Sequence, residues 1–514
     1  MQQLFTRKPI ADLIPDAEHT GLKRSLNKWH LTALGVGATI GAGIFATTGT
    51  AIVGDAARPG AGPAIVLSFL LTAVACGFAA LCYAEFAAMV PISGSAYTYS
   101  YAALGELVAW IIGWDLIVEY AVGNIGVAIG WAGHFRELMS HFGVAVPAWL
   151  ATDYRSAFDA VHAVAAGATD AGNLYLASAV DLAPRIAGIP LIFNLPAFLV
   201  VMAITVVLVI GVRESANTNN AMVVLKIGLI LFFIAVGAFL IKPEHWTTHA
   251  LVEGGSGFAP NGWKGISAGA AIIFFSYIGF DAVSTASEEA QNPAKDMPFG
   301  IIASLIICTV LYIILSVVMT GMAPWTQLGT AEPMITALQY SGGPEKLVAF
   351  SRFVIALGAV IAMGSVLLVF QMGQPRIFYS MARDGLLPPF IAKIHPKYRT
   401  PWVGTIITGL FVGGFAAVAN IAEVVDLTNI GTLFAFILVS LGVIILRVKE
   451  PDRPRPFRVW GAPWTPILSI VSCLYLMLQL PGITWIRFGI WLGLGLIIYF
   501  AYGIRHSKLR EPTA

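Results

Sequence analysis

Long apolar runs constrain this chain more than any other feature of its sequence. A helix of about 20 apolar residues is long enough to cross the hydrocarbon core of a bilayer. Twelve runs of this kind predict an all-α integral membrane protein with twelve transmembrane helices. They lie near residues 31–54, 63–90, 105–135, 192–212, 219–241, 265–289, 298–322, 347–376, 401–420, 425–447, 464–481 and 485–504.

The composition excludes several other classes of protein. Charged residues make up 11% of the chain, whereas soluble proteins carry about 25%. The sequence has no basic stripe of the kind that would indicate nucleic-acid binding. The four cysteines all lie inside apolar runs and the nine histidines have no ligand spacing, so we expect neither a metal site nor a cofactor.

The distribution of Lys and Arg predicts the orientation of the chain. Cytoplasmic loops carry an excess of basic residues, and most Lys and Arg lie on the side of the N-terminus if all twelve runs cross. We therefore expect a multi-pass protein of the inner (plasma) membrane with both termini in the cytoplasm. Charged residues before the first run argue against a cleavable signal peptide.

No hydrophilic segment is long enough to fold as a separate domain. We expect a cytoplasmic N-terminal segment at 1–30, one transmembrane domain at 31–504 and a cytoplasmic tail at 505–514. Residues 136–190 are expected to form an outside loop with one or two short helices. Residues 383–400 are basic and amphipathic, which predicts that they lie along the inner membrane surface.

Two of the apolar runs are interrupted. Residues 39–49 read TIGAGIFATTG, and Gly41 and Gly43 at the centre of this run each cost a helix about 1 kcal/mol relative to alanine. The sixth run contains FFSYIGFDAVSTASEE at 274–289, where Ser276 and Gly279 break the apolar pattern. Glycines that only let helices pack closely are the alternative explanation for either interruption.

The interrupted runs stand five apart, which is typical of inverted-repeat secondary transporters. We expect two repeats of five helices, at about 31–241 and 265–447, followed by two extra helices at 464–504. Unwound backbone is tolerated at membrane depth only where it lines a cavity or is buried in protein. Both interruptions are therefore expected to line a substrate site.

The two broken helices would offer complementary groups to a ligand. The second half of span 1 begins near Gly43 and presents N–H groups and a positive dipole end, which bind an anion. The first half of span 6 ends near Ile278 and presents carbonyl groups, which accept hydrogen bonds from an ammonium group. The pair predicts a site for a zwitterion such as an amino acid. Asp281 is either the N-cap of the second half of span 6 or a residue that faces the substrate.

Four stretches carry a resemblance to a known family. They are TIGAGIF (39–45), PISGSAYTYSY (91–101), FFSYIGFDAVSTASEEAQNP (274–293) and GQPRIFYSMARDGLLP (373–388). The sequence resembles the amino acid–polyamine–organocation (APC) superfamily of permeases, and within it a bacterial member of the cationic amino acid transporter branch. The resemblance implies a fold like that of the sodium-coupled leucine transporter and alternating access around spans 1 and 6.

The resemblance also implies roles for individual residues. Amides of the broken span 1 would hold the substrate carboxylate, and span 6 carbonyls would meet its ammonium group. The ring of Phe275 resembles the gate that closes over bound substrate. The matching substrate-binding positions are Ile40, Gly41, Ala42, Gly43 and Ile44 in span 1, and Phe275, Ser276 and Ile278 in span 6.

Lys226 lies about 10 Å inside span 5. A lysine at this depth can snorkel back to the interface. Alternatively, Lys226 faces the broken part of span 1, where related transporters bind sodium. Protonation would then tie span 5 to span 1, and deprotonation would release it. We expect proton coupling through Lys226, which is also the position that the resemblance indicates.

Asp115 and Glu119 stand four residues apart on one face of span 3, where two like charges repel. They require a cation or a proton. One interpretation is a neutral pair held by hydrogen bonds, which would also admit small neutral amino acids. The other is an acidic subsite for the side chain of arginine, lysine or ornithine, and Asp281 joins Asp115 and Glu119 among the predicted substrate-binding residues.

The sequence thus predicts proton-coupled import of cationic L-amino acids by alternating access, with the proton as coupling ion. The alternatives are a permease for neutral small amino acids, an exchanger and a polyamine or amine carrier. A channel would need a repeated selectivity sequence or a charged ring, and an enzyme would need a catalytic constellation; the sequence shows neither. The expected partners are an amino acid substrate and the lipid bilayer. A small single-span partner and a homo-oligomer both stay open.

Overall fold

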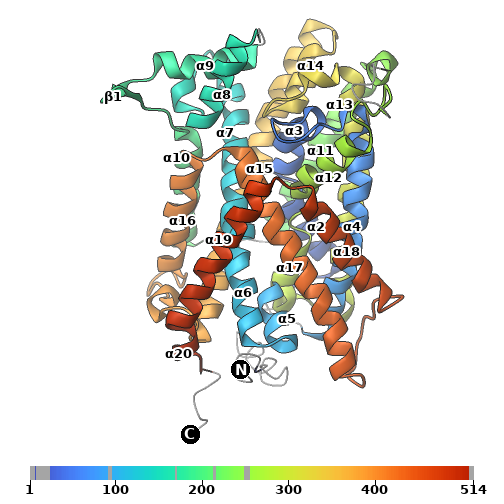
Figure 1. Cartoon of the computed structure of the whole chain (residues 1–514), viewed down its shortest axis with the longest axis vertical. Helices are drawn as coiled ribbons and strands as arrows, with labels where there is room; N and C mark the ends of the chain where they lie inside the picture. Colours follow the sequence, from blue (N-terminus) through green and yellow to red (C-terminus); the bar gives the residue numbers. More distant parts are fainter. Residues whose placement is uncertain are drawn as a thin grey trace.

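The computed structural model describes Thr6 and residues 24–90, 95–167, 171–211, 216–247 and 255–508. Most of the predicted N-terminal segment 1–30, residues 91–94 of PISGSAYTYSY and the last six residues of the predicted tail lie outside the described residues. The described part is mostly helical and forms one elongated bundle (Figure 1). The prediction of an all-α membrane protein is confirmed at this level.

Regular helices make up most of the bundle. They are α2 (Lys28–Thr39), α3 (Thr48–Val53), α4 (Ile65–Met89), α5 (Ser95–Ala103), α6 (Glu106–Ile117), α7 (Gly123–His141), α8 (Tyr154–Ala165), α9 (Ala171–Leu182), α10 (Leu195–Ile210), α11 (Ala216–Ala238), α12 (Gly262–Ile273), α13 (Pro293–Met322), α14 (Pro333–Tyr340), α15 (Glu345–Arg383), α16 (Trp402–Ala416), α17 (Ile421–Lys449), α18 (Trp464–Leu478), α19 (Gly482–Ile498) and α20 (Ile504–His506).

Tighter or wider helical turns and one small sheet complete the fold. The π-helical turns are η2 (Gly43–Thr47), η4 (Val118–Val122) and η11 (Tyr499–Gly503). The 3₁₀ segments are η3 (Gly62–Ala64), η5 (Ala148–Leu150), η6 (Pro243–Trp246), η7 (Phe274–Ser276), η8 (Asp281–Glu289), η9 (Trp325–Gln327) and η10 (Pro389–Ala392). Strand β1 (Arg185–Ile186) pairs antiparallel with β2 (Ile189–Pro190).

Nine helical segments in the described residues are long and apolar enough to cross a membrane. Three further apolar helices, α10, α16 and α18, coincide with predicted spans but are shorter. The count of twelve crossings, the five-plus-five repeat and the domain boundaries stay predictions.

The interrupted spans lie at the centre of the bundle. The most apolar part of Gly262–Glu289 is 100% buried, whereas that of Gly482–His506 is 22% buried. Buried glycine, serine and alanine in α12 therefore pack against protein, while isoleucine and leucine on α19 face outward. The predicted site thus lies inside the bundle, and the C-terminal helices lie on its periphery.

The two ends of the bundle differ. Helices α8, α9 and α14 lie at one end, called here the α9 end, and α5 and α20 lie at the other, the α20 end (Figure 1). The predicted loop 136–190 contains α8 and α9, as expected, together with the unpredicted β1–β2 hairpin. This region has a small apolar core of its own, formed by Ala148, Ala157, Ala179, Ala183 and Ile192.

A buried carboxylate joins three elements at the α20 end. Glu85 in α4 is fully buried and accepts a hydrogen bond from Arg447 Nε at 3.0 Å. Arg455 Nε lies 3.4 Å from its carboxylate, and the N–H of Val459 donates to it at 2.8 Å. Glu85 thereby fixes the end of α17 and the following loop against α4.

We predict that Glu85→Gln lowers the stability of the protein by about 3 kcal/mol, because it leaves two arginines without their buried partner. Thermal unfolding in detergent measures the effect. The matched control is Glu450→Gln, whose pair with Arg453 is partly exposed and is worth less than about 1 kcal/mol. Equal unfolding temperatures for both variants would contradict this account of the α20 end.

Candidate functional site

The first interruption lies where the sequence predicts it. Helix α2 ends at Thr39, and Ile40 has an extended backbone with φ −75° and ψ 96°. The chain resumes as η2 at Gly43 and continues into α3. The N–H groups of residues 41–44 therefore lie at the start of a new helical segment, where no preceding turn supplies acceptors. Such a helix start can bind an anion.

The second interruption separates η7 from η8. Helix α12 gives way to η7, which ends at Ser276, and η8 begins at Asp281. Gly279 between them has a φ of +122°, which favours glycine. The sequence predicts that the first half of span 6 ends near Ile278. It ends two residues earlier, at Ser276, because the chain tightens into a 3₁₀ turn before it unwinds. The carbonyl groups at this end are the last of their helix and can accept hydrogen bonds from a ligand.

Asp281 is not the N-cap of the second half of span 6. Phe280 holds that position, without a side-chain hydrogen bond. Asp281 is the first residue of η8, and its Oδ1 accepts a hydrogen bond from the N–H of Gly279 at 3.3 Å. The carboxylate reaches back to stabilise the turn instead of capping the following helix.

The two interruptions face each other directly. A Cβ added at Gly43 would lie 2.7 Å from the backbone nitrogen of Ser276. A Cβ at Gly279 would lie 2.8 Å from the carbonyl carbon of Ala38. Real Cβ contacts are not this short, so glycine at both positions permits the two backbones to touch. Close packing therefore accounts for the absence of a side chain at both positions, and it brings the two helix ends together.

Phe275 lies on the α9 side of Ser276 and contacts span 3. Its ring atom Cζ is 3.3 Å from the position of a Cβ at Gly126, and Val424 of α17 lies 3.4 Å from the same position. The side chain is buried, with 5% of its surface exposed. Phe275 thus closes the space between α12 and α7, and its role as a gate stays a prediction.

Lys226 contacts the first half of span 1. Its side chain is fully buried, and Nζ donates a hydrogen bond to the carbonyl of Gly37 at 2.5 Å. Gly37 belongs to the last turn of α2, directly before the interruption. Because the side chain has no exposed surface, Lys226 does not snorkel. Lys226 therefore joins α11 to the last turn of α2.

Two residues that the sequence analysis missed bind other backbone groups at the interruptions. The hydroxyl of Tyr312 in α13 donates to the carbonyl of Thr39 at 3.0 Å. The amide of Asn429 in α17 donates to the carbonyl of Ala271 at 2.7 Å. The polar run Thr428–Asn429 inside an apolar span was a signal for Asn429, whereas nothing in the sequence distinguished Tyr312 from a packing tyrosine.

The predicted acidic residues form a buried group away from Phe275. Glu119 lies within hydrogen-bonding reach of Asp281, and neither carboxyl oxygen of Asp115 has a partner among the described residues. Glu119 is seven residues from Gly126, about 10 Å along the helix toward the α20 end. The structure brings Glu119 and Asp281 together, and it places Asp115 one further turn toward the α20 end.

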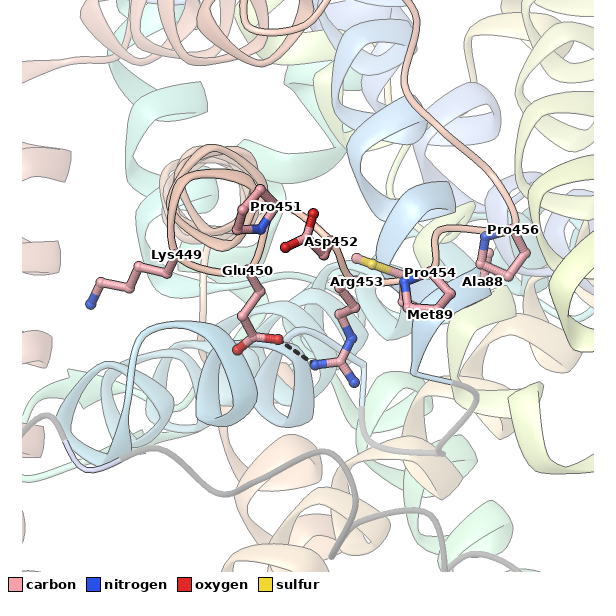
Figure 2. A pocket seen from close by; sticks show the side chains of 9 residues that line it. All are labelled: Ala88, Met89, Lys449, Glu450, Pro451, Asp452, Arg453, Pro454 and Pro456. Atoms are coloured by element: carbon pink, nitrogen blue, oxygen red, sulfur yellow. Dashed lines mark hydrogen bonds and ion pairs between the residues drawn. The ribbon is translucent and has the colours of Figure 1, made fainter.

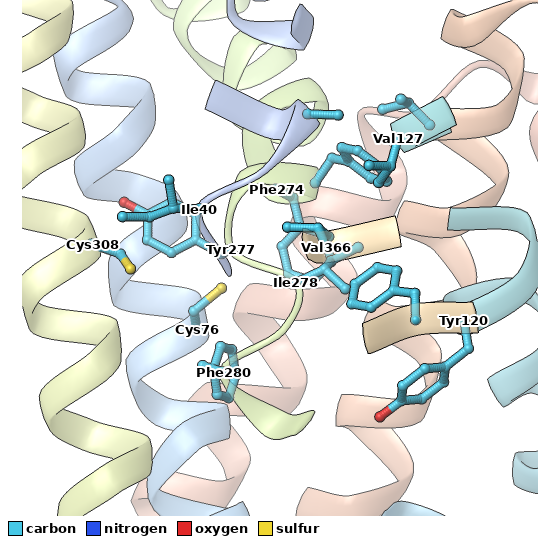
Figure 3. Close-up of a cluster of buried hydrophobic side chains, with 14 of the residues drawn as sticks. Ile40, Cys76, Tyr120, Val127, Phe274, Tyr277, Ile278, Phe280, Cys308 and Val366 are labelled. Atoms are coloured by element: carbon cyan, nitrogen blue, oxygen red, sulfur yellow. The ribbon is translucent and has the colours of Figure 1, made fainter. Parts of the chain in front are cut away.

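Apolar side chains surround the interruptions. Val366 of α15 lies 3.1 Å from the position of a Cβ at Gly41. Figure 3 shows Val366 close to Ile278, with Tyr120 on the neighbouring helix. These side chains are buried. Apolar side chains therefore line part of the space around the two helix ends.

Ion pairs join the helices at the α9 end. Arg58, which follows α3, is 2.8 Å from Asp426 of α17. Arg136 of α7 is 3.1 Å from Glu332, the residue before α14. Arg352 of α15 is paired with Glu137 of α7 at 2.6 Å. These pairs hold the α9 end together above the interruptions.

A surface pocket of about 710 Å³ opens at the α20 end (Figure 2). It is lined by Ala88 and Met89 at the end of α4 and by residues 449–454 and Pro456. Glu450 and Arg453 of this lining form an ion pair at 2.6 Å, so their charges neutralise each other. The pocket lies outside the group of residues that the sequence predicts as the substrate site.

A helical bundle with two broken central helices and a buried lysine is typical of membrane transport proteins. The chain belongs to the amino acid permease family, whose sequence profile matches residues 26–498. This family lies in the APC superfamily, so the resemblance drawn from the four stretches is confirmed. The protein is accordingly a transporter of the multi-pass membrane class.

Several relatives align over most of the chain. The branched-chain amino acid permease BcaP of Bacillus subtilis (strain 168) is 44% identical over 99% of both chains. The methylthioribose transporter of the same organism is 42% identical over 99% of this chain and all of its own length. The vacuolar cationic amino acid transporter 4 of Arabidopsis thaliana is 35% identical over 88% of this chain and 68% of its own.

We predict that Gly43→Ala lowers the uptake of every substrate by roughly tenfold or more, because the added methyl group pushes the two helix ends apart and misplaces the binding groups. Uptake of labelled leucine and arginine into proteoliposomes measures the effect. The matched control is Gly77→Ala in α4, where a Cβ meets nothing within 4 Å. Normal uptake by Gly43→Ala would show that the contact does not position the site.

Proposed function

We propose that the protein is a proton-coupled amino acid permease of the plasma membrane that imports its substrate by alternating access. In this proposal the α20 end and both termini face the cytoplasm, and spans 1–5 and 6–10 form inverted repeats like those of the leucine transporter fold. The excess of Lys and Arg in the segments assigned to that end supports this orientation.

The α-carboxylate of the substrate binds the N–H groups of residues 41–44, since the N–H of Ile40 already donates to the carbonyl of Val36. The α-ammonium group binds the carbonyls of Phe275, Ser276 and Ile278. Support comes from the position of the two helix ends, which touch at Gly43 and Ser276. One end offers donors and the other offers acceptors, so a zwitterion satisfies both. Phe275, packed against Gly126, closes over the bound molecule.

Lys226 carries the coupling proton. The observation that supports this role is the hydrogen bond from its buried Nζ to the carbonyl of Gly37. When Lys226 is protonated, the bond ties α11 to α2. Loss of the proton removes the positive charge and weakens the bond, which frees the first half of span 1 to move. The site then needs no sodium ion.

The substrate class that the geometry favours is L-amino acids with aliphatic side chains. Val366, Val424 and Ile278 lie around the helix ends, and apolar lining selects apolar groups. The similarity to a branched-chain amino acid permease supports the same class. Glu119 and Asp281 then share a hydrogen bond as a neutral pair, in place of the Asp115–Glu119 pair that the sequence suggested. A neutral pair admits uncharged substrates.

Cationic L-amino acids, which the sequence pattern favoured, are the second candidate. The observation in their favour is the buried group of Asp115, Glu119 and Asp281, in which the oxygens of Asp115 have no partner among the described residues. An extended guanidinium or ammonium side chain would bind there. The similarity to cationic amino acid transporters also supports this candidate.

We predict that Lys226→Met and Lys226→Arg each lower proton-driven accumulation of leucine by roughly tenfold, a loss of coupling worth about 1.4 kcal/mol. Methionine cannot bind a proton, and arginine cannot release one. Uptake into proteoliposomes with and without an inward proton gradient measures the effect. Lys264→Met is the control, since Lys264 is exposed.

Two results would contradict the role of Lys226. One is gradient-driven uptake by Lys226→Met at the level of the native protein. The other is uptake by the native protein that depends on sodium and not on the proton gradient.

We predict that unlabelled isoleucine and valine compete with labelled leucine at least about tenfold better than arginine does, because an unpaired guanidinium is costly among apolar side chains. If arginine competes equally and Glu119→Gln removes only its competition, the cationic class is correct. If neither class competes, the proposed amino acid specificity is wrong.

A further inference from the structure

Residues 389–399, named here the basic-apolar segment, connect α15 to α16 and expose apolar and basic side chains together. Phe390 and Ile394 are each 48% exposed, and Tyr398 is 37% exposed. Lys393 and Lys397 between them are also exposed, and Lys397 Nζ lies 5.4 Å from the ring centroid of Tyr398. Large apolar side chains at a water-exposed surface would be unfavourable without a covering partner.

The basic-apolar segment is held in one position. The hydroxyl of Thr400, directly after it, donates to the carbonyl of Val209 in α10 at 2.8 Å. Nδ1 of His395 accepts from the N–H of Tyr398 at 3.2 Å. Ile391 packs against the main core. The exposed side chains are therefore presented by an ordered backbone fixed between α10 and α15.

The positive charges of this region are not neutralised by neighbouring acids. Lys393, Lys397 and Arg399 are exposed and form no ion pair within the described part of the chain. The sequence contains no Asp or Glu between residues 385 and 422. Asp384, just before the segment, accepts a hydrogen bond from the hydroxyl of Tyr97. The segment therefore presents a net positive surface.

The lipid-facing surface of the bundle begins beside this segment. Ile210 at the end of α10 is 52% exposed, and Leu410 of α16 is 56% exposed. The segment lies at the α20 end, where α16 begins (Figure 1). A helix end that meets both lipid and water lies at the level of the phospholipid head groups.

We propose that the basic-apolar segment binds acidic phospholipid at the membrane surface. Phe390, Ile394 and Tyr398 enter the boundary between head groups and acyl chains, which removes their apolar surface from water. Lys393, Lys397 and Arg399 contact the lipid phosphates, and their attraction is greatest for lipids with net negative charge. The segment thereby anchors the connection between α15 and α16 to one leaflet.

The test uses the full-length protein with Pro396→Cys labelled by an environment-sensitive fluorophore. Pro396 is exposed, whereas the cysteines of the described residues are buried. The labelled protein is reconstituted in phosphatidylcholine vesicles that contain either spin-labelled phosphatidylglycerol or spin-labelled phosphatidylcholine at equal amounts. We expect phosphatidylglycerol to quench the fluorophore at least about twofold more, and we expect this preference to shrink at high salt.

In the triple variant Lys393→Gln, Lys397→Gln and Arg399→Gln, we expect both spin-labelled lipids to quench the fluorophore equally. The matched control removes the same charge from exposed positions elsewhere and is expected to keep the preference for phosphatidylglycerol. It combines Arg185→Gln, Lys264→Gln and Lys346→Gln. Leucine uptake shows that each variant is folded. Equal quenching in the native protein, no quenching by either lipid, or a preference that survives the triple variant would overturn the proposal.

Discussion

Inside a bilayer, backbone N–H and C=O groups without helical partners are costly, and this cost governs the centre of the molecule. Two helices end there and resume, so each leaves groups that another part of the protein or a ligand must satisfy. The contact between Gly43 and the Ser276 backbone brings the donors of one helix to the acceptors of the other. The rest of the bundle encloses this contact.

Neighbouring helices satisfy some of these groups. Lys226 binds the carbonyl of Gly37, Tyr312 that of Thr39, and Asn429 that of Ala271. The first half of span 1 is therefore tied to α11 and α13, while α12 is tied to α17. Of these three bonds, only the one from Lys226 changes its charge when a proton leaves. This difference is the basis for our proposal that proton movement at Lys226 is linked to movement of span 1.

Much of this centre could be predicted from the sequence, because Gly41, Gly43 and Gly279 interrupt long apolar runs and Lys226 is a charge at membrane depth. The end of the first half of span 6 at Ser276 could not be predicted, because 3₁₀ and α-helical turns have similar patterns of apolar residues in the sequence. Long-range pairs such as Arg58–Asp426 and Glu85–Arg447 were also hidden, because pairing across hundreds of residues depends on helix packing. The acidic residues illustrate the same limit: their spacing on span 3 was visible, but not their distance from Phe275.

The most direct test of the central claim is a cryo-EM structure with leucine bound. The account predicts ligand density between residues 40–44 and Phe275–Ile278, with the carboxylate against the start of η2 and the ammonium group against the end of η7. Density at the Glu119–Asp281 pair, or in the pocket beside residues 449–456, with no ligand between the two helix ends, would contradict it.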